Sequence, residues 1–130
     1  MDELVQWLRE QLDDDERTAR AATDGPWTTM GQRVLDPSPP SNRLGIGMAV
    51  GHAAASADYN ETAEHIARHD PERVLREIDA KRQLLYQFEQ RGNSVRATVK
   101  PPTGGVWDDM LRLLALPYAD RPGYREEWRP

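Results

Sequence analysis

Apolar side chains recur every three or four residues in several segments of the chain, which is the spacing of one face of a helix. The first segment runs from the N-terminus to about Thr23, before Gly25-Pro26, and the last is centred on Leu111 and ends at Pro117. A third and longer segment, PERVLREIDAKRQLLYQFEQR, lies between these two. One core is predicted to hold the side chains Trp7, Leu8, Ile78, Leu85, Trp107 and Leu111.

The sequence signals where the long middle helix begins and ends. A shorter helix over the stretch ETAEHIARH is predicted to precede it. Asp70 is suited to cap the first turn of the long helix, and Pro71 suits the first helical position because proline has no N–H to leave unpaired. Gly92 is suited to the position just past its end. The Asp70-Pro71 junction is therefore predicted to separate two helices.

A different pattern appears in RLGIGMAVG, where large apolar residues alternate with glycine and alanine, as in a strand. This predicts a strand over residues 43–51, paired through a proline-rich loop with a weaker strand over residues 27–36. The small-residue stretch AAASAD that follows is predicted to be a linker. The predicted fold class is α+β and mostly helical, with this one antiparallel hairpin packed against three to four helices in a single domain of residues 1–130.

The composition and charge of the chain exclude several kinds of site and partner. The chain of 130 residues has no cysteine and a formal net charge of −5. Disulfides and thiolate metal sites are therefore excluded. The net charge argues against general binding to nucleic acids or anionic membranes. The start of the chain lacks the pattern of a secretion signal, and no apolar run is long enough to span a bilayer, so a cytoplasmic location is expected.

The histidines are the candidate metal ligands. His65 and His69 are four residues apart on a predicted helix, a spacing that allows two imidazoles to share one zinc ion. His52, Asp58 and Asp70 are the further candidates nearby, and Asp70 is better suited to a cap. The zinc-protease pattern is incomplete because Ile66, and not glutamate, follows His65. The simpler interpretation has no cofactor, with His65 half-buried and His69 near a helix end, where its cation would be favoured. No catalytic residue is assigned.

Two other segments suggest contacts with partners. The stretch 68–82 is rich in arginine and lysine, but Glu72, Glu77 and Asp79 favour ion pairs within the helix over nucleic-acid binding. The segment 118–130 has no helical period yet contains Tyr118, Tyr124 and Trp128. It is predicted to be an extended tail that docks on the core or on a second subunit, because the burial of aromatic rings is strongly favourable.

Three blocks of sequence carry a resemblance to a known family. The stretch HIARHDPERVLREIDAKRQLL, the ending LRLLALPYADRPGYREEWRP and the early ATDGPW resemble an uncharacterised family of short proteins from actinobacteria and their phages or prophages. The order of elements is also similar to that of accessory proteins of temperate phages. The resemblance implies no activity, cofactor or catalytic residue.

These observations leave three hypotheses open. The first is a non-enzymatic accessory binding module of the phage or prophage type, acting through protein–protein contacts or self-association, with a homo-oligomer as one form. The second is a small metal-dependent hydrolase that uses His65 and His69. The third is a nucleic-acid-binding protein that uses the basic helix 68–82. The absence of a complete catalytic set favours the first.

Overall fold

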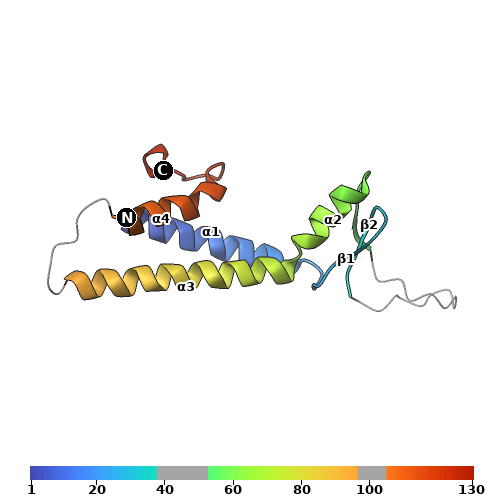
Figure 1. Cartoon of the computed structure of the whole chain (residues 1–130), viewed down its shortest axis with the longest axis horizontal. Coiled ribbons are helices and arrows are strands. Elements are labelled where there is room, and N and C mark those ends of the chain that lie inside the picture. The colour runs from blue at the N-terminus through green and yellow to red at the C-terminus, as the bar shows by residue number, and fades with distance from the viewer. Residues whose placement is uncertain (38–52, 97–104) are drawn as a thin grey trace. The chain divides into compact units, whose positions relative to one another are not determined.

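The structure, a computed structural model, describes residues 1–37, 53–96 and 105–130, with the backbone alone for residues 91–96 (Figure 1). Within these ranges it contains four helices and a three-stranded antiparallel sheet, which confirms the α+β, mostly helical class. The elements are α1 (Asp2–Ala21), β1 (Thr28–Met30), β2 (Arg33–Leu35), β3 (Ala53–Ser56), α2 (Asn60–Arg68), α3 (Pro71–Arg96), α4 (Val106–Ala115) and the 3-10 turns η1 (Leu116–Tyr118) and η2 (Glu126–Trp128).

The chain divides into two compact units. The tail unit comprises Met1–Asp14 and Ile78–Pro130, and the sheet unit comprises Asp15–Glu77. The helices α1 and α3 each contribute residues to both units, because each helix passes one of the boundaries. The two units are described one at a time below.

The tail unit has a core of leucine and aromatic side chains. Five of the six predicted core residues are buried, whereas Trp107 is half-buried. The side chains of Leu4 and Leu12 from α1 and of Leu85 from α3 are among the largest fully buried ones in the described residues. The buried residues of this unit are Leu4, Val5, Trp7, Leu8, Leu12, Ile78, Leu85, Leu111, Ala115, Tyr118 and Trp128.

The sheet unit contains a three-stranded sheet, with strand order β1-β2-β3, in place of the predicted two-stranded hairpin. The segment 27–36 is not one strand: it turns at Gly31, which adopts a φ of 61° that favours glycine, so that β1 pairs with β2. The third strand, Ala53–Ser56, lies in the predicted linker and pairs with β2. The predicted strand 43–51 lies outside the described residues.

The sheet is covered by a helix of the same unit. Figure 1 shows α2 against the sheet, and its contacts are with β1 and β2. Val34 of the central strand and Ala63 of α2 are fully buried, which places a small apolar core between the two layers. The buried apolar residues of this unit are Ala19, Val34, Leu35 and Ala63, fewer than in the tail unit, so this core buries less apolar surface.

The helix ends also differ in part from the sequence prediction. The helix α3 begins at Pro71 as predicted, but it continues through Gly92 to Arg96. Glycine lowers helix stability by about 1 kcal/mol relative to alanine, which is too little to end a long helix by itself. The tail contains the turns η1 and η2 instead of being extended throughout. Within the described ranges, no helix is long and apolar enough to cross a bilayer.

Candidate functional site

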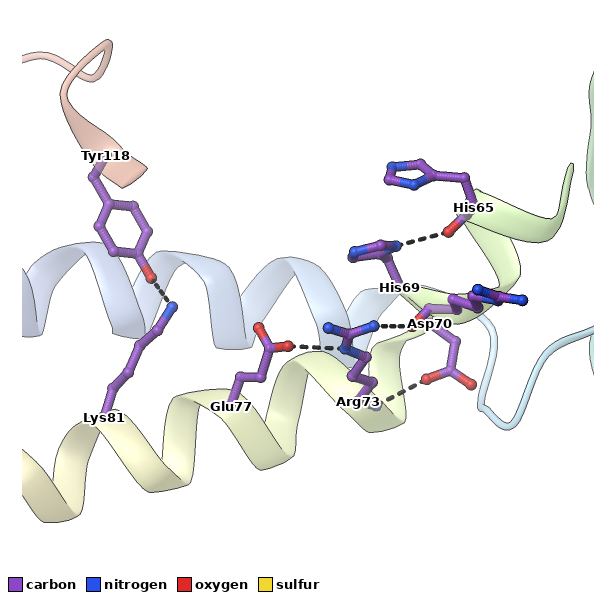
Figure 2. A network of polar contacts seen from close by, with 8 residues as sticks. His65, His69, Asp70, Arg73, Glu77, Lys81 and Tyr118 are labelled. Carbon is purple, nitrogen blue, oxygen red and sulfur yellow. Dashed lines mark hydrogen bonds and ion pairs between the residues drawn. The ribbon is translucent and has the colours of Figure 1, made fainter. Parts of the chain in front are cut away.

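The two helical histidines lie side by side at the end of α2. The centroids of the His65 and His69 rings are 4.3 Å apart, with 39° between the ring planes. Nδ1 of His69 lies 2.7 Å from the carbonyl oxygen of His65 (Figure 2). Both residues are exposed, so the sequence-based expectation that His65 is half-buried is wrong. The structure thus brings these two candidate ligands together on the surface.

The remaining candidate ligands do not complete a metal site. Among the residues that the structure describes, no group of three or more histidine, aspartate or glutamate side chains is arranged to hold an ion. His52 lies outside the described residues. The arrangement offers two imidazoles to an ion, and the described residues add no carboxylate to them.

Asp70 occupies the joint between α2 and α3 and is buried. Its Oδ1 accepts a hydrogen bond from the backbone N–H of Arg73 at 2.8 Å, which confirms the predicted N-cap (Figure 2). Its Oδ2 accepts a second bond, at 2.9 Å, from the backbone N–H of Trp27. The carboxylate therefore joins the loop after α1 to the start of α3, and this second role was not predicted.

Gly25 allows the loop after α1 to pack closely against the first turn of α3. A Cβ atom built on Gly25 would lie 2.8 Å from Cβ of Glu72 and 3.0 Å from Oδ2 of Asp70. The first distance is shorter than real Cβ contacts, and the second is tighter than most, so a side chain at this position would push the loop away from the first turn of α3. Two of the three sequence blocks, ATDGPW and HIARHDP, thus meet at one buried carboxylate.

The basic residues of 68–82 are already engaged. Their partners are acids one helical turn away or residues of the tail unit, and the ion pairs are largely exposed. The pairs are Arg68 with Glu64 (3.8 Å), Arg73 with Glu77 (2.8 Å), Arg76 with Glu72 (3.0 Å), Arg82 with Asp13 (2.6 Å) and Lys81 with the hydroxyl of Tyr118 (2.9 Å). Phosphate groups would have to compete with these carboxylates.

In the tail unit, aromatic rings gather around Trp7 of α1. We define the tail cluster as Trp7, Tyr118, Tyr124 and Trp128. The ring of Trp7 lies 6.5, 5.6 and 5.5 Å from those of Tyr118, Tyr124 and Trp128. Its Nε1 donates a hydrogen bond to the carbonyl oxygen of Pro122 at 3.1 Å. The cluster therefore buries aromatic surface and also satisfies the polar atom of its central ring.

One glycine is required for the tail to pass so close to Trp7. Gly123 has a φ of 86°, a conformation that side chains disfavour. A Cβ atom at this position would lie 2.9 Å from Nε1 of Trp7. The sequence signal that could have located this contact is the Arg-Pro-Gly-Tyr turn in the middle of the tail.

Ion pairs surround the tail cluster. Glu3 of α1 accepts a hydrogen bond from Arg125, which raises the pKa of the arginine above its ordinary value. The same guanidinium lies 5.2 Å from the ring centroid of Trp128. Arg129 donates two hydrogen bonds to Glu126, at 2.9 and 3.1 Å, which lower the pKa of that carboxyl group. These pairs are exposed, and they favour the folded tail only weakly.

A groove lies between the start of α1 and the tail, within the tail unit. Its lining includes Trp7, Trp128 and Arg125. The two tryptophans are only 8% and 7% exposed, so a ligand in the groove would reach little of their rings. The cation position next to Trp128 is taken by Arg125. This groove therefore offers little free surface to a ligand.

A free apolar surface is found on α4 and at the start of η1. We define the α4 face as Val106, Asp109, Leu113 and Leu116, which follow one another at spacings of three and four and are all exposed. Val106 is 73% exposed, Leu113 is 57% exposed and Leu116 is 39% exposed. The opposite side of the helix buries Leu111 and Ala115. The sequence analysis placed Leu111 in the core and did not single out the apolar residues of the opposite side.

The comparisons with known proteins give a family but no activity. No curated protein and no solved structure matches this chain. One family matches over its whole length, residues 1–130, and its description states that its function is unknown. The chain belongs to this family, the Family of unknown function (DUF6221).

Proposed function

We propose that the protein is a non-enzymatic binding module that acts through a protein–protein contact made by the α4 face. The observation that supports this proposal is the exposure of Val106, Leu113 and Leu116 on one side of a helix whose other side is buried. A helix in a small domain normally has charged residues on its outer side. Apolar side chains there are stabilised when a partner covers them.

The charges of the α4 face make a second copy of the chain the first partner to test. Asp109 lies on the face, and Arg112 lies at its border, three residues further along. A two-fold axis through the middle of the face would pair the helices in opposite directions. In the register in which Val106 meets Leu116, Asp109 of each copy would lie opposite Leu113, one position from Arg112 of the other copy.

The α4 face is small. Ten helical residues extend over about 15 Å, so the face alone covers much less than the roughly 800 Å² per partner of a stable interface. The proposal therefore requires a weak, reversible contact. The resemblance to actinobacterial and phage sequences supports a role as an accessory protein in the cytoplasm of such cells.

Sedimentation equilibrium of the full chain, up to about 0.1 mM, tests the self-association. Leu113→Glu should shift the equilibrium to monomer because it places a charge at the centre of the contact. Tyr86→Glu is the matched control, since Tyr86 is exposed to a similar extent, 55%, but lies on α3. It should leave the equilibrium unchanged.

A photo-crosslinking amino acid at position 113 extends the test to other protein partners in host cells, with position 86 as the control. A single crosslinked species that forms from position 113, and not from position 86, would identify the partner. The proposal is wrong if the chain stays monomeric and position 113 captures nothing.

A further inference from the structure

We propose that His65 and His69 form a two-imidazole binding site for a divalent transition metal ion, zinc first, at the end of α2. This site lies in the sheet unit and shares no residue with the α4 face. It is therefore independent of the proposed function.

The hydrogen bond between the two residues determines which nitrogen of His69 is available. The carbonyl oxygen of His65 can only accept, so Nδ1 of His69, at 2.7 Å, carries the proton and donates. The lone pair of the neutral ring is then on Nε2. Metal-binding histidines commonly hold their other ring nitrogen in this way, by donation to a carbonyl group. His69 is therefore oriented as a ligand before the ion arrives.

The two rings are close enough to serve one ion together. Residues four apart lie one above the other on a helix, and the two ring centroids here are 4.3 Å apart. Zinc binds an imidazole nitrogen at about 2.0–2.1 Å, so for an ion next to Nε2 of His69 to be chelated, the His65 ring has to turn away from its present tilted contact with the His69 ring. Figure 2 shows both rings on the same side of α2, with His69 held by its dashed contact to the backbone.

The surrounding charges permit a cation at this position. The C-terminal end of a helix carries a partial negative charge, and α2 ends at Arg68. The guanidinium of Arg68 lies 3.8 Å from Glu64, and that of Arg73 lies 2.8 Å from Glu77. These two arginine charges are therefore each balanced by a carboxylate.

The protein supplies two ligands from the residues that the structure describes, so water would occupy the other positions around the ion. Two imidazoles suit zinc, nickel and copper better than magnesium or calcium, which prefer oxygen ligands. The site should therefore discriminate between these classes. Copper should bind more tightly than zinc, as expected for nitrogen ligands.

Calorimetric titration of the full chain, without a histidine tag, with zinc chloride tests the site. One equivalent of zinc should bind, and magnesium should give no signal. His65→Gln and His69→Gln should each weaken zinc binding roughly tenfold or more, because one imidazole cannot chelate. Both side chains are exposed, so circular dichroism should show that the variants fold as the parent does.

The third histidine provides the matched control: His52→Gln should bind zinc like the parent. A nitrogen-15 spectrum of the imidazole rings should show that zinc shifts the Nε2 resonance of His69 and leaves its Nδ1 protonated. The proposal is overturned if binding does not saturate by about 1 mM zinc. It is also overturned if His52→Gln loses as much affinity as the other two variants, or if Nε2 of His69 does not respond.

Discussion

The tail unit and the sheet unit are stabilised in different ways. The tail unit buries five residues of α1 and two aromatic rings of the tail around a core of leucines. The sheet unit buries fewer apolar side chains, none of them aromatic, together with two aspartates, Asp36 and Asp70. A buried carboxylate is tolerated only when hydrogen bonds compensate its lost hydration, and Asp70 receives two from backbone N–H groups.

This difference indicates how each unit should respond to mutation. Apolar packing is spread over many contacts, so the stability of the tail unit depends on how completely side chains fill its core. The joint of the sheet unit depends on two directed bonds to one residue. Substitutions that remove volume should therefore affect the tail unit most, and those that remove a hydrogen-bond acceptor should affect the sheet unit most.

The largest effect is expected for Leu85→Ala in the tail unit. Leu85 is 2% exposed, and its truncation should lower the free energy of unfolding by about 2–5 kcal/mol, through lost burial and the cavity left behind. Urea denaturation measures this change. Leu84→Ala is the matched control: Leu84 is 39% exposed, and its truncation should cost well under half as much. Equal losses in both variants would show that Leu85 is not a core residue.

The second prediction concerns Asp70→Ala in the sheet unit. The change removes the N-cap of α3 and leaves the N–H of Trp27 without its acceptor, so it should cost about 1–3 kcal/mol. Asp70→Asn keeps one side-chain oxygen and should cost less. Hydrogen exchange should locate the loss in the loop before β1 and at the start of α3. Faster exchange confined to the tail unit would contradict the assigned role of Asp70.

The third prediction, with a smaller expected effect, compares removal of the hydroxyl groups of two tyrosines of the tail cluster. The hydroxyl of Tyr118 accepts a hydrogen bond from Lys81 at 2.9 Å, so Tyr118→Phe should cost about 0.5–1.5 kcal/mol. The hydroxyl of Tyr124 is buried and has no hydrogen-bond partner among the described residues. Tyr124→Phe should therefore be neutral or stabilising in thermal denaturation. A loss of stability in Tyr124→Phe would reveal a bond to that hydroxyl.

The sequence predicted the features that depend on local patterns. Helical spacing identified the apolar faces of α1 and α4, and cap chemistry located the start of α3 at Pro71. It also identified His65 and His69 as neighbours. These predictions succeeded because a helix brings together residues that are close in sequence.

The features that the sequence did not reveal depend on residues far apart in the chain. The bond between Trp27 and Asp70 spans 43 positions, and that between Trp7 and Pro122 spans 115. The turn at Gly31 was read as strand interior, although glycine there supplies the positive φ that a tight hairpin needs. The third strand was missed because AAAS has no alternation of polar and apolar residues to indicate it.

The smallest effect concerns the ion pair between Glu126 and Arg129 at the end of the tail unit. Hydrogen bonds from Arg129 lower the pKa of Glu126 below its ordinary value of 4.5. The pair therefore stabilises the folded tail at neutral pH, and this contribution is lost as the pH falls through the lowered pKa of the folded state. Glu126→Gln should remove the contribution, so the stabilities of the variant and the parent should converge in acid. Glu127→Gln, with the same change of charge one residue away, should keep it. Thermal denaturation between neutral and acidic pH measures the difference, and a gap between parent and Glu126→Gln that widens in acid would show that the shift has the opposite sign.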